Sequence, residues 1–267
     1  MLSLKHIKKR FRLDENPEND RLALKDLSLD INDGDFISVI GGNGSGKSTL
    51  LNIIAGSLFP DGGTISLDGE DITKMKEHKR AKFIGRVFQD PLLGSIGDMT
   101  LEENLSLANR RGKSHTLRWY IKKDERENYI KMLEPLDLHL EGRLEMRMKS
   151  FSGGERQSIT LLMASLNQPK LLLLDEHTAA LDPKTASKVM EFTSSLVEKN
   201  KTPTLMITHN MKDAIKYGNR LIMMKEGEIV LDVKGEEKKN LTIDYLLHKF
   251  AEEEISFDPS VEQSSGQ

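Results

Sequence analysis

The chain has 267 residues, 37% hydrophobic and 30% charged, which is the composition of a globular protein long enough for one or two domains. It contains no cysteine, and this excludes disulfides, thiolate metal sites and cysteine nucleophiles. The chain has 39 Lys and Arg and 42 Asp and Glu, which gives a formal net charge of −3. It therefore lacks the overall positive charge that would indicate a nucleic-acid partner.

The predicted elements begin with strands. Apolar and polar residues alternate over 27–31, the turn signal Asn-Asp-Gly follows at 32–34, and the apolar run 36–40 predicts a buried strand. We therefore expect the first 40 residues to form antiparallel strands, with a turn of the hairpin kind leading into one buried strand.

Beyond the first 60 residues, strand and helix signals alternate. Helices are expected at 183–199 and 211–217, and strands at 64–67, 84–88, 171–174, 204–208 and 220–224. This alternation predicts an α/β fold with a mostly parallel sheet, interrupted by a helix-rich insertion at about 90–165. We expect a single domain over residues 1–250, an amphipathic helix at 243–250 and a flexible tail at 251–267.

A glycine-rich loop follows the buried strand and reads GGNGSGKST, which satisfies the pattern G-x4-G-K-[ST]. In this pattern backbone N–H groups cradle phosphate oxygens, the lysine binds the β- and γ-phosphates and the hydroxyl ligates Mg²⁺. Ser48 is therefore the predicted metal ligand of the loop. The predicted nucleotide site consists of Gly41, Gly42, Asn43, Gly44, Ser45, Gly46, Lys47, Ser48 and Thr49.

Two acidic residues end the leucine run at 171–174. Asp175 is expected to hold Mg²⁺, and Glu176 to orient or deprotonate the attacking water. Taken alone, such a pair could equally cap a turn or helix, but the phosphate loop upstream favours the catalytic interpretation. A GTPase would need Asn-Lys-x-Asp, and the nearest segment, 200–203, lacks the aspartate.

The remaining motifs resemble those of the ATP-binding-cassette (ABC) ATPases. The segment FSGGERQ at 151–157 resembles the Leu-Ser-Gly-Gly-Gln signature, and Gln89 in VFQDP resembles the Q-loop. Leu181-Asp182 resembles the D-loop, and His209 in MITHN resembles the switch histidine. The resemblance covers roughly residues 1–235 and implies a P-loop NTPase core, an N-terminal antiparallel β subdomain and an inserted α-helical signature subdomain.

The resemblance also implies roles for residues outside the phosphate loop. His209 would position Glu176 and water, Gln89 would contact Mg²⁺ or water, and Phe11 would stack on adenine. Structural alternatives stay open, because a strand-end histidine, a loop glutamine and a core aromatic are common. ATP held by a second subunit would be contacted by Ser152, Gly153, Gly154, Glu155 and Asp182, although Ser152 could also simply cap a helix.

Two residues depart from the usual pattern. Glu155 replaces the glutamine of the signature, at a position peripheral to the phosphate contact. His177 follows Glu176 where proline is usual. This histidine either covers the end of the strand or adds a pH dependence near neutrality, the range in which histidine titrates.

The resemblance implies a motor for transport. Two chains would bind two ATP molecules head to tail, as a homodimer, and work peripherally at the cytoplasmic face of the cell membrane. No apolar stretch approaches the roughly 20 residues of a membrane-spanning helix, so separate permease chains, and possibly a solute-binding protein, are expected. The loop after Gln89 and the helical block would receive a permease coupling helix.

The solute is less clearly indicated. The run LLLLDEHTAALDPKTA and the segment 110–123 resemble ATPases of branched-chain-amino-acid-like permeases, which suggests import of an amino acid or similar small solute. The alternatives are ABC ATPases without a transport role, either of the iron–sulfur assembly type or of the lipoprotein and cell-division type.

Overall fold

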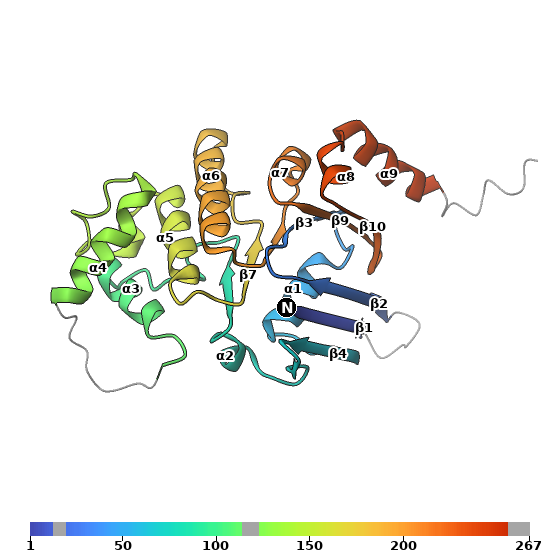
Figure 1. The fold of residues 1–267 in the computed structure, drawn as a ribbon, viewed down its shortest axis with the longest axis horizontal. Coiled ribbons are helices and arrows are strands. Elements are labelled where there is room, and N and C mark those ends of the chain that lie inside the picture. The colour runs from blue at the N-terminus through green and yellow to red at the C-terminus, as the bar shows by residue number, and fades with distance from the viewer. Residues whose placement is uncertain (13–19, 114–122, 256–267) are drawn as a thin grey trace, which may run out of the picture.

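The computed structural model describes residues 1–12, 20–113 and 123–255, and it contains two β-sheets (Figure 1). The first sheet has four antiparallel strands in the order β2-β1-β4-β5. Its strands are β1 (Leu2–Phe11), β2 (Arg21–Ile31), β4 (Gly62–Leu67) and β5 (Glu70–Asp71). This sheet confirms the expected N-terminal antiparallel subdomain.

The second sheet has six strands in the order β10-β9-β3-β8-β7-β6, and all neighbours are parallel except β9 and β10. Its strands are β3 (Phe36–Gly41), β6 (Ile84–Val87), β7 (Leu171–Asp175), β8 (Thr204–Ile207), β9 (Arg220–Lys225) and β10 (Glu228–Lys234). All residues of β3 are buried, as expected for the interior of a parallel sheet. The sequence analysis missed β10, in which every residue but Val233 is partly or fully exposed.

The turn at 32–34 is not a hairpin, so that part of the sequence prediction is wrong. Strand β2 pairs with β1 in the first sheet, whereas β3 pairs with β8 and β9 in the second. The turn therefore carries the chain from one sheet to the other. Alternating burial in β2 suits a sheet with one covered face, and the fully buried β3 can only belong to an interior position.

Helix α1 (Lys47–Ala55) lies in the hydrophobic core shared by the two sheets. Its side chains Leu50, Leu51, Ile53 and Ile54 are buried together with residues of β1, β2, β3 and β7. The phosphate loop is thus anchored on both sides by packed elements. The helices α6 (Pro183–Asn200) and α7 (Met211–Lys216) confirm the two helices expected in the second half of the chain.

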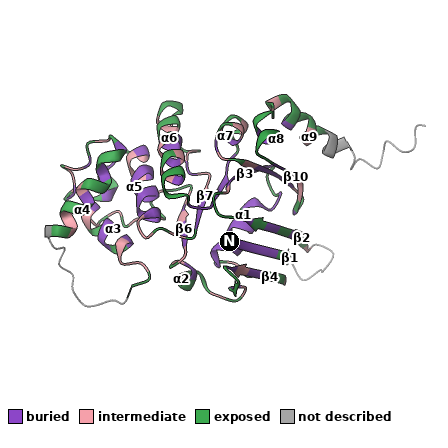
Figure 2. Ribbon diagram, viewed as in Figure 1, coloured by how far each residue is buried: buried purple, intermediate pink, exposed green. Residues whose placement is uncertain are grey.

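A helical block lies between β6 and β7, as predicted for about 90–165, and forms a separate lobe in Figure 1. It contains α3 (Leu101–Asn109), α4 (Lys123–Leu133) and α5 (Gly153–Ser165). The block has its own buried cluster, which includes Leu105, Tyr129, Leu133 and Phe151. Figure 2 shows buried residues along α3, α4 and α5. Because β6 and β7 are hydrogen-bonded neighbours, the block leaves and re-enters the core at adjacent strands.

The remaining α-helices of the described chain are α2 (Glu77–Arg80), α8 (Glu236–Lys239) and α9 (Ile243–Ile255), and two short 3-10 helices lie at Glu134–Leu136 and Met148–Ser150. Helix α9 confirms the expected helix at 243–250 and continues five residues further, to Ile255. The expected flexibility at 251–267 concerns residues that lie largely outside those described, and the 1–250 boundary stays a prediction. Within the described ranges, no helix combines the length and apolar character needed to cross a membrane.

Candidate functional site

The phosphate loop ends in a helix start that lacks a side-chain cap. Gly46 is the N-cap of α1, with a left-handed backbone at φ 101°, and no side chain caps the helix. A Cβ atom at this position would lie 2.6 Å from the carbonyl oxygen of Ala23, so only glycine fits. The N–H groups of the first turn are therefore available to an anion.

Lys47 lies inside this loop and is nearly fully buried. Its ammonium donates hydrogen bonds to the carbonyl oxygens of Gly41, at 2.8 Å, and Gly42, at 2.9 Å. Burial lowers the pKa of Lys47, while the charges of Glu176 and Asp175 act in the opposite direction. The ammonium of Lys47 is thus close enough to both predicted carboxylates to interact with them electrostatically.

A cavity of about 210 Å³ brings most of the predicted nucleotide residues together. Phe11 is among them and is substantially exposed, which disfavours the alternative that it is a core aromatic. Glu176 and His209 also face this cavity, although they come from different strand ends. The complete lining is Phe11, Arg21, Ala23, Asn43, Gly44, Ser45, Gly46, Lys47, Ser48, Thr49, Glu176 and His209.

Arg21 and Ala23 are residues of the cavity that the sequence analysis missed. Arg21 is the antiparallel partner of Phe11, and its Nη2 atom donates to the carbonyl oxygen of Gly44 at 3.1 Å. The strand pairing carries the signal that would have found them, because the residue opposite Phe11 must lie at the same end of the sheet. The sequence alone contains no indication of that register.

Glu176 and His209 are in contact. The Nε2 atom of His209 lies 2.6 Å from Oε1 of Glu176. Their strands β7 and β8 are parallel neighbours, so both side chains leave the same edge of the sheet. Glu176 has a left-handed backbone at φ 46°, which is rare for a side chain other than glycine and is typical of functional sites. The amide N–H of Glu176 is held by the carbonyl oxygen of Ile207 at 3.1 Å.

A second, larger cavity of about 510 Å³ lies on the other side of this pair, lined by residues of α6 and α7. Glu176 and His209 line both cavities, and Thr208 and Asn210 belong to the second. The two catalytic candidates are therefore common to the walls of both cavities.

Asp175 at the end of β7 and Ser48 in the first turn of α1 have the chemistry to hold magnesium together with phosphate. Asp175 offers a carboxylate and Ser48 a hydroxyl, both hard oxygen ligands of the kind Mg²⁺ prefers. Within the described part of the chain, no three His, Cys, Asp or Glu side chains form a cluster able to hold a metal. A magnesium ion would therefore need phosphate oxygens and water to complete its coordination.

The signature segment lies on a different element from the phosphate loop. Ser152 caps α5 by accepting a hydrogen bond from the amide of Glu155 at 3.3 Å, and Glu155 accepts one from the amide of Ser152 at 2.8 Å. The Glu155 carboxylate also pairs with Arg143. Its oxygens are thus engaged within the chain, and a nucleotide contact from Glu155 stays a prediction. Exposed Ser152 does not line the cavity around Lys47.

The D-loop residue Asp182 also caps a helix, accepting from the amide of Thr185 at 3.1 Å at the start of α6. The two helix starts pack tightly, because a Cβ atom at Gly154 would lie 2.1 Å from Cγ2 of Thr185. The structure therefore places Gly153, Gly154 and Asp182 together, away from Lys47. Gln89 is exposed beyond β6 and does not line the phosphate cavity, so its predicted role also stays a prediction.

His177 is buried, and its Nε2 atom lies 3.1 Å from the hydroxyl of Thr193. Burial lowers the pKa of His177 to about 4. The hypothesis that this residue titrates near neutrality is therefore wrong. The alternative given by the sequence, that His177 covers the strand end, agrees with its buried position.

The comparisons with known proteins agree with this geometry. A family described as "ABC transporter" matches residues 24–179. The chain is 49% identical over 251 residues to the "Tyrosine transport ATP-binding protein" of Clostridioides difficile, covering 94% of this chain and 98% of that protein. It is 33% identical to the "Spermidine/putrescine import ATP-binding protein PotA" of Haemophilus ducreyi, covering 84% of this chain and 58% of that protein.

Solved structures show the same fold. The dimeric ATP-binding cassette MJ0796 bound to ADP and Pi superimposes with a TM-score of 0.74 at 30% identity, over 88% of this chain and 98% of that one. The ADP conformation of the cassette MJ1267 gives a TM-score of 0.75 at 29% identity, over 94% and 98% respectively. The chain therefore belongs to the ABC transporter family, as an ATP-binding subunit with ATPase activity.

Proposed function

We propose that this subunit powers the import of an amino acid, with tyrosine as the first candidate, through separate permease chains at the cytoplasmic face of the membrane. The observation that carries the proposal is the 49% identity, over nearly the full length of both chains, to a tyrosine transport ATP-binding protein. The name of this relative agrees with the substrate class expected from the sequence, which is an amino acid. It gives less support to a branched-chain substrate, because tyrosine is aromatic.

The proposed working form is a head-to-tail homodimer. One chain carries the phosphate cradle around Lys47, whereas Ser152 at the start of α5 lies outside that cavity. The 13-residue helix α5 begins next to exposed Ser152, and in this proposal its N-terminus is the second anion site. A second copy would bring this site to the γ-phosphate held by the first, so that ATP binding stabilises the dimer.

The residues proposed for hydrolysis, apart from Asp175, line one cavity. Lys47 and the first-turn amides of α1 bind the phosphates, and Phe11 stacks on the base. When bound, Mg²⁺ supplies neutralisation of the phosphate charge, with Ser48 and Asp175 as its ligands on this chain. Glu176 orients a water molecule and accepts its proton, while His209 holds Glu176 in place.

The proposed permease contact is an apolar surface beside the helical block. Leu92, Leu93, Ile96 and Leu107 are exposed there, Leu93 to 69%. Two cavities of about 230 and 250 Å³ open on this surface and share Leu93, Gly94 and Arg111. An amphipathic helix with an acidic residue would bury the leucines and pair with Arg111, whose pKa is lowered by burial.

The proposal is tested by uptake and by capture. Cells lacking this gene should lose energised uptake of labelled tyrosine, recover it with the wild-type chain, and not recover it with Glu176→Gln. Tagged Glu176→Gln protein, purified from its own membranes with ATP, should retain a polytopic permease in mass spectrometry. Capture of iron–sulfur assembly proteins alone, or of a lipoprotein or cell-division complex with normal amino-acid uptake, would transfer support to the corresponding alternative.

A further inference from the structure

Arg86 lies beside the predicted metal carboxylate, at a position that the motifs do not include. It is on β6, next to β7, and three residues before Gln89. Its side chain is 14% exposed, so the guanidinium is largely removed from water. Neither the resemblance nor the proposed mechanism gives this arginine a role.

The guanidinium of Arg86 is held by polar and aromatic neighbours. Its Nη2 atom lies 3.3 Å from Oδ2 of Asp175 and donates to Oδ1 of Asn52 at 2.8 Å. Its Cζ atom lies 4.5 Å from the ring centroid of Phe88, the residue that precedes Gln89. Its Nη1 atom also lies 3.5 Å from the hydroxyl of Ser57 and 3.9 Å from Oε1 of Glu77. These polar contacts and the aromatic contact leave the planar group little freedom to turn.

Asn52 links this arrangement to the phosphate loop. It lies on α1, one helical turn after Ser48, so both side chains are on the same face of the helix. Arg86 therefore connects two of the predicted magnesium ligands indirectly: it contacts Asp175 itself and Asn52, the residue one turn after Ser48.

We propose that Arg86 is a positioning residue for Asp175, holding its Oδ2 atom so that the other carboxylate oxygen is directed to Mg²⁺. This inference rests on the proposed metal role of Asp175. Partners that fix the orientation of a metal-ligating carboxylate commonly change metal affinity by about 10–100-fold when they are removed. Another arginine–aspartate ion pair lies away from the predicted metal site and provides a control.

An opposing electrostatic effect makes the direction of the result informative. The arginine and the metal are both cations, so they repel each other, and an arginine that only competed for Asp175 would weaken metal binding. Its removal would then tighten metal binding. Removal of Arg86 would thus weaken metal binding if the arginine orients Asp175, and would tighten metal binding if the arginine only competes with the metal.

The experiment measures Mn²⁺ binding by electron paramagnetic resonance in the full-length protein, saturated with a non-hydrolysable ATP analogue. We expect about a 10-fold loss of Mn²⁺ affinity in Arg86→Met, with partial recovery in Arg86→Lys. Binding of a fluorescent ATP analogue in EDTA should be unchanged, because Arg86 does not line the phosphate cavity. Unchanged or tighter Mn²⁺ binding in Arg86→Met would overturn the proposal.

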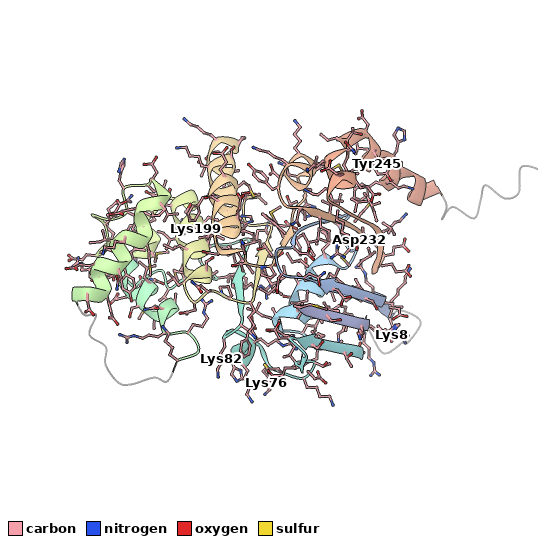
Figure 3. The ribbon with its side chains drawn as sticks, viewed as in Figure 1. Lys8, Lys76, Lys82, Lys199, Asp232 and Tyr245 are labelled. Atoms are coloured by element: carbon pink, nitrogen blue, oxygen red, sulfur yellow. The ribbon has the colours of Figure 1, made fainter. Side chains whose placement is uncertain are left out.

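The control is Arg220→Met. Arg220 on β9 is 12% exposed and pairs with Asp232 of β10, labelled in Figure 3, near the opposite edge of the sheet from β6. This variant should lose stability without losing Mn²⁺ affinity. Should Arg86→Met fail to fold, Asn52→Ala removes one anchor of the guanidinium and should weaken Mn²⁺ binding in the same direction. Wild-type protein that bound no nucleotide at all would instead refute the proposed site itself.

Discussion

The Nε2 atom of His209 lies 2.6 Å from Oε1 of Glu176, and both side chains face the cavity that contains Lys47. They come from the ends of adjacent parallel strands, so their contact follows from the sheet order β8-β7. In the proposed mechanism Glu176 is the base that accepts the proton of water, and His209 is the partner that holds this base.

Glu176→Gln should bind ATP, form a stable dimer and lose at least 100-fold in turnover, because an amide cannot accept the proton of water. Steady-state phosphate release and size-exclusion chromatography with ATP measure the two effects. His209→Ala should also slow turnover, by a smaller factor, since it leaves the carboxylate present. Wild-type turnover in Glu176→Gln would remove this residue from the catalytic role.

Lys47→Ala should lose nucleotide binding itself, with a dissociation constant raised at least 10-fold, because the buried ammonium is the cation inside the phosphate loop. Titration with a fluorescent ATP analogue measures this. Lys199→Ala, an exposed position at the end of α6 that Figure 3 labels, is the control and should bind normally. Equal affinity in both variants would contradict the proposed phosphate site.

Arg80→Met should lower the free energy of unfolding by about 2–4 kcal/mol, because it leaves buried carbonyl groups without a donor. Arg80 is fully buried, and burial lowers its pKa to about 10, so it remains charged at neutral pH. Its guanidinium donates to the carbonyl oxygens of Ile53, Ile54, Ile72, Thr73 and Met75.

Urea denaturation measures the loss, and Arg10→Met, at an exposed side chain, should stay within about 0.5 kcal/mol of wild type. A similar midpoint for Arg80→Met and Arg10→Met would show that the carbonyl groups around Arg80 find other partners. Two of these carbonyl groups belong to the last turn of α1. A large loss of unfolding free energy would therefore also show that Arg80 stabilises the C-terminal end of the helix that follows the phosphate loop.

His177 should make the fold less stable as the pH falls from 6.5 to 4. Its pKa is lowered to about 4 in the folded chain from an ordinary 6.5, so the unfolded chain takes up a proton first. Within this window the residue lowers the free energy of unfolding by about 1.4 kcal/mol per pH unit, and above pH 6.5 it has no effect. His177→Gln should show a shallower decline of the urea midpoint over this range.

The pH profile of hydrolysis between pH 6.5 and 8.5 should be the same in His177→Gln and in wild type, after correction for the amount of folded protein. A profile displaced near neutrality by this substitution would contradict the neutral, buried state of the histidine. Wild-type and variant urea midpoints that fall in parallel below pH 6.5 would contradict it independently.

The sequence could predict the parts of the site that are local. The phosphate loop needs glycines at fixed spacing before a helix, and Gly46 and Lys47 are accordingly found where α1 begins. The end of a buried leucine strand likewise predicted the position of Asp175. The contact between Glu176 and His209 depends on which strands are neighbours, and the family resemblance supplied it where hydrophobic periodicity could not.

Non-local contacts escaped prediction. Arg21 lines the cavity around Lys47 only because the pairing of β1 with β2 puts it opposite Phe11. Arg86 contacts Asp175 only because β6 lies beside β7. The turn at 32–34 was misjudged for the same reason, since its residues do not reveal which sheet receives the next strand. Likewise, the burial of His177 depends on the packing of α6, which carries Thr193.

Arg86 also lines the cavity of about 230 Å³ that opens on the proposed permease surface, together with Leu93 and Arg111. A helix seated there would displace water next to the guanidinium and lower the local dielectric constant. The attraction between Arg86 and Asp175 would then increase although neither residue had moved. Docking of a permease would in this way change the electrostatic environment of the Asp175 carboxylate without any backbone displacement. The infrared band of that carboxylate would shift in response.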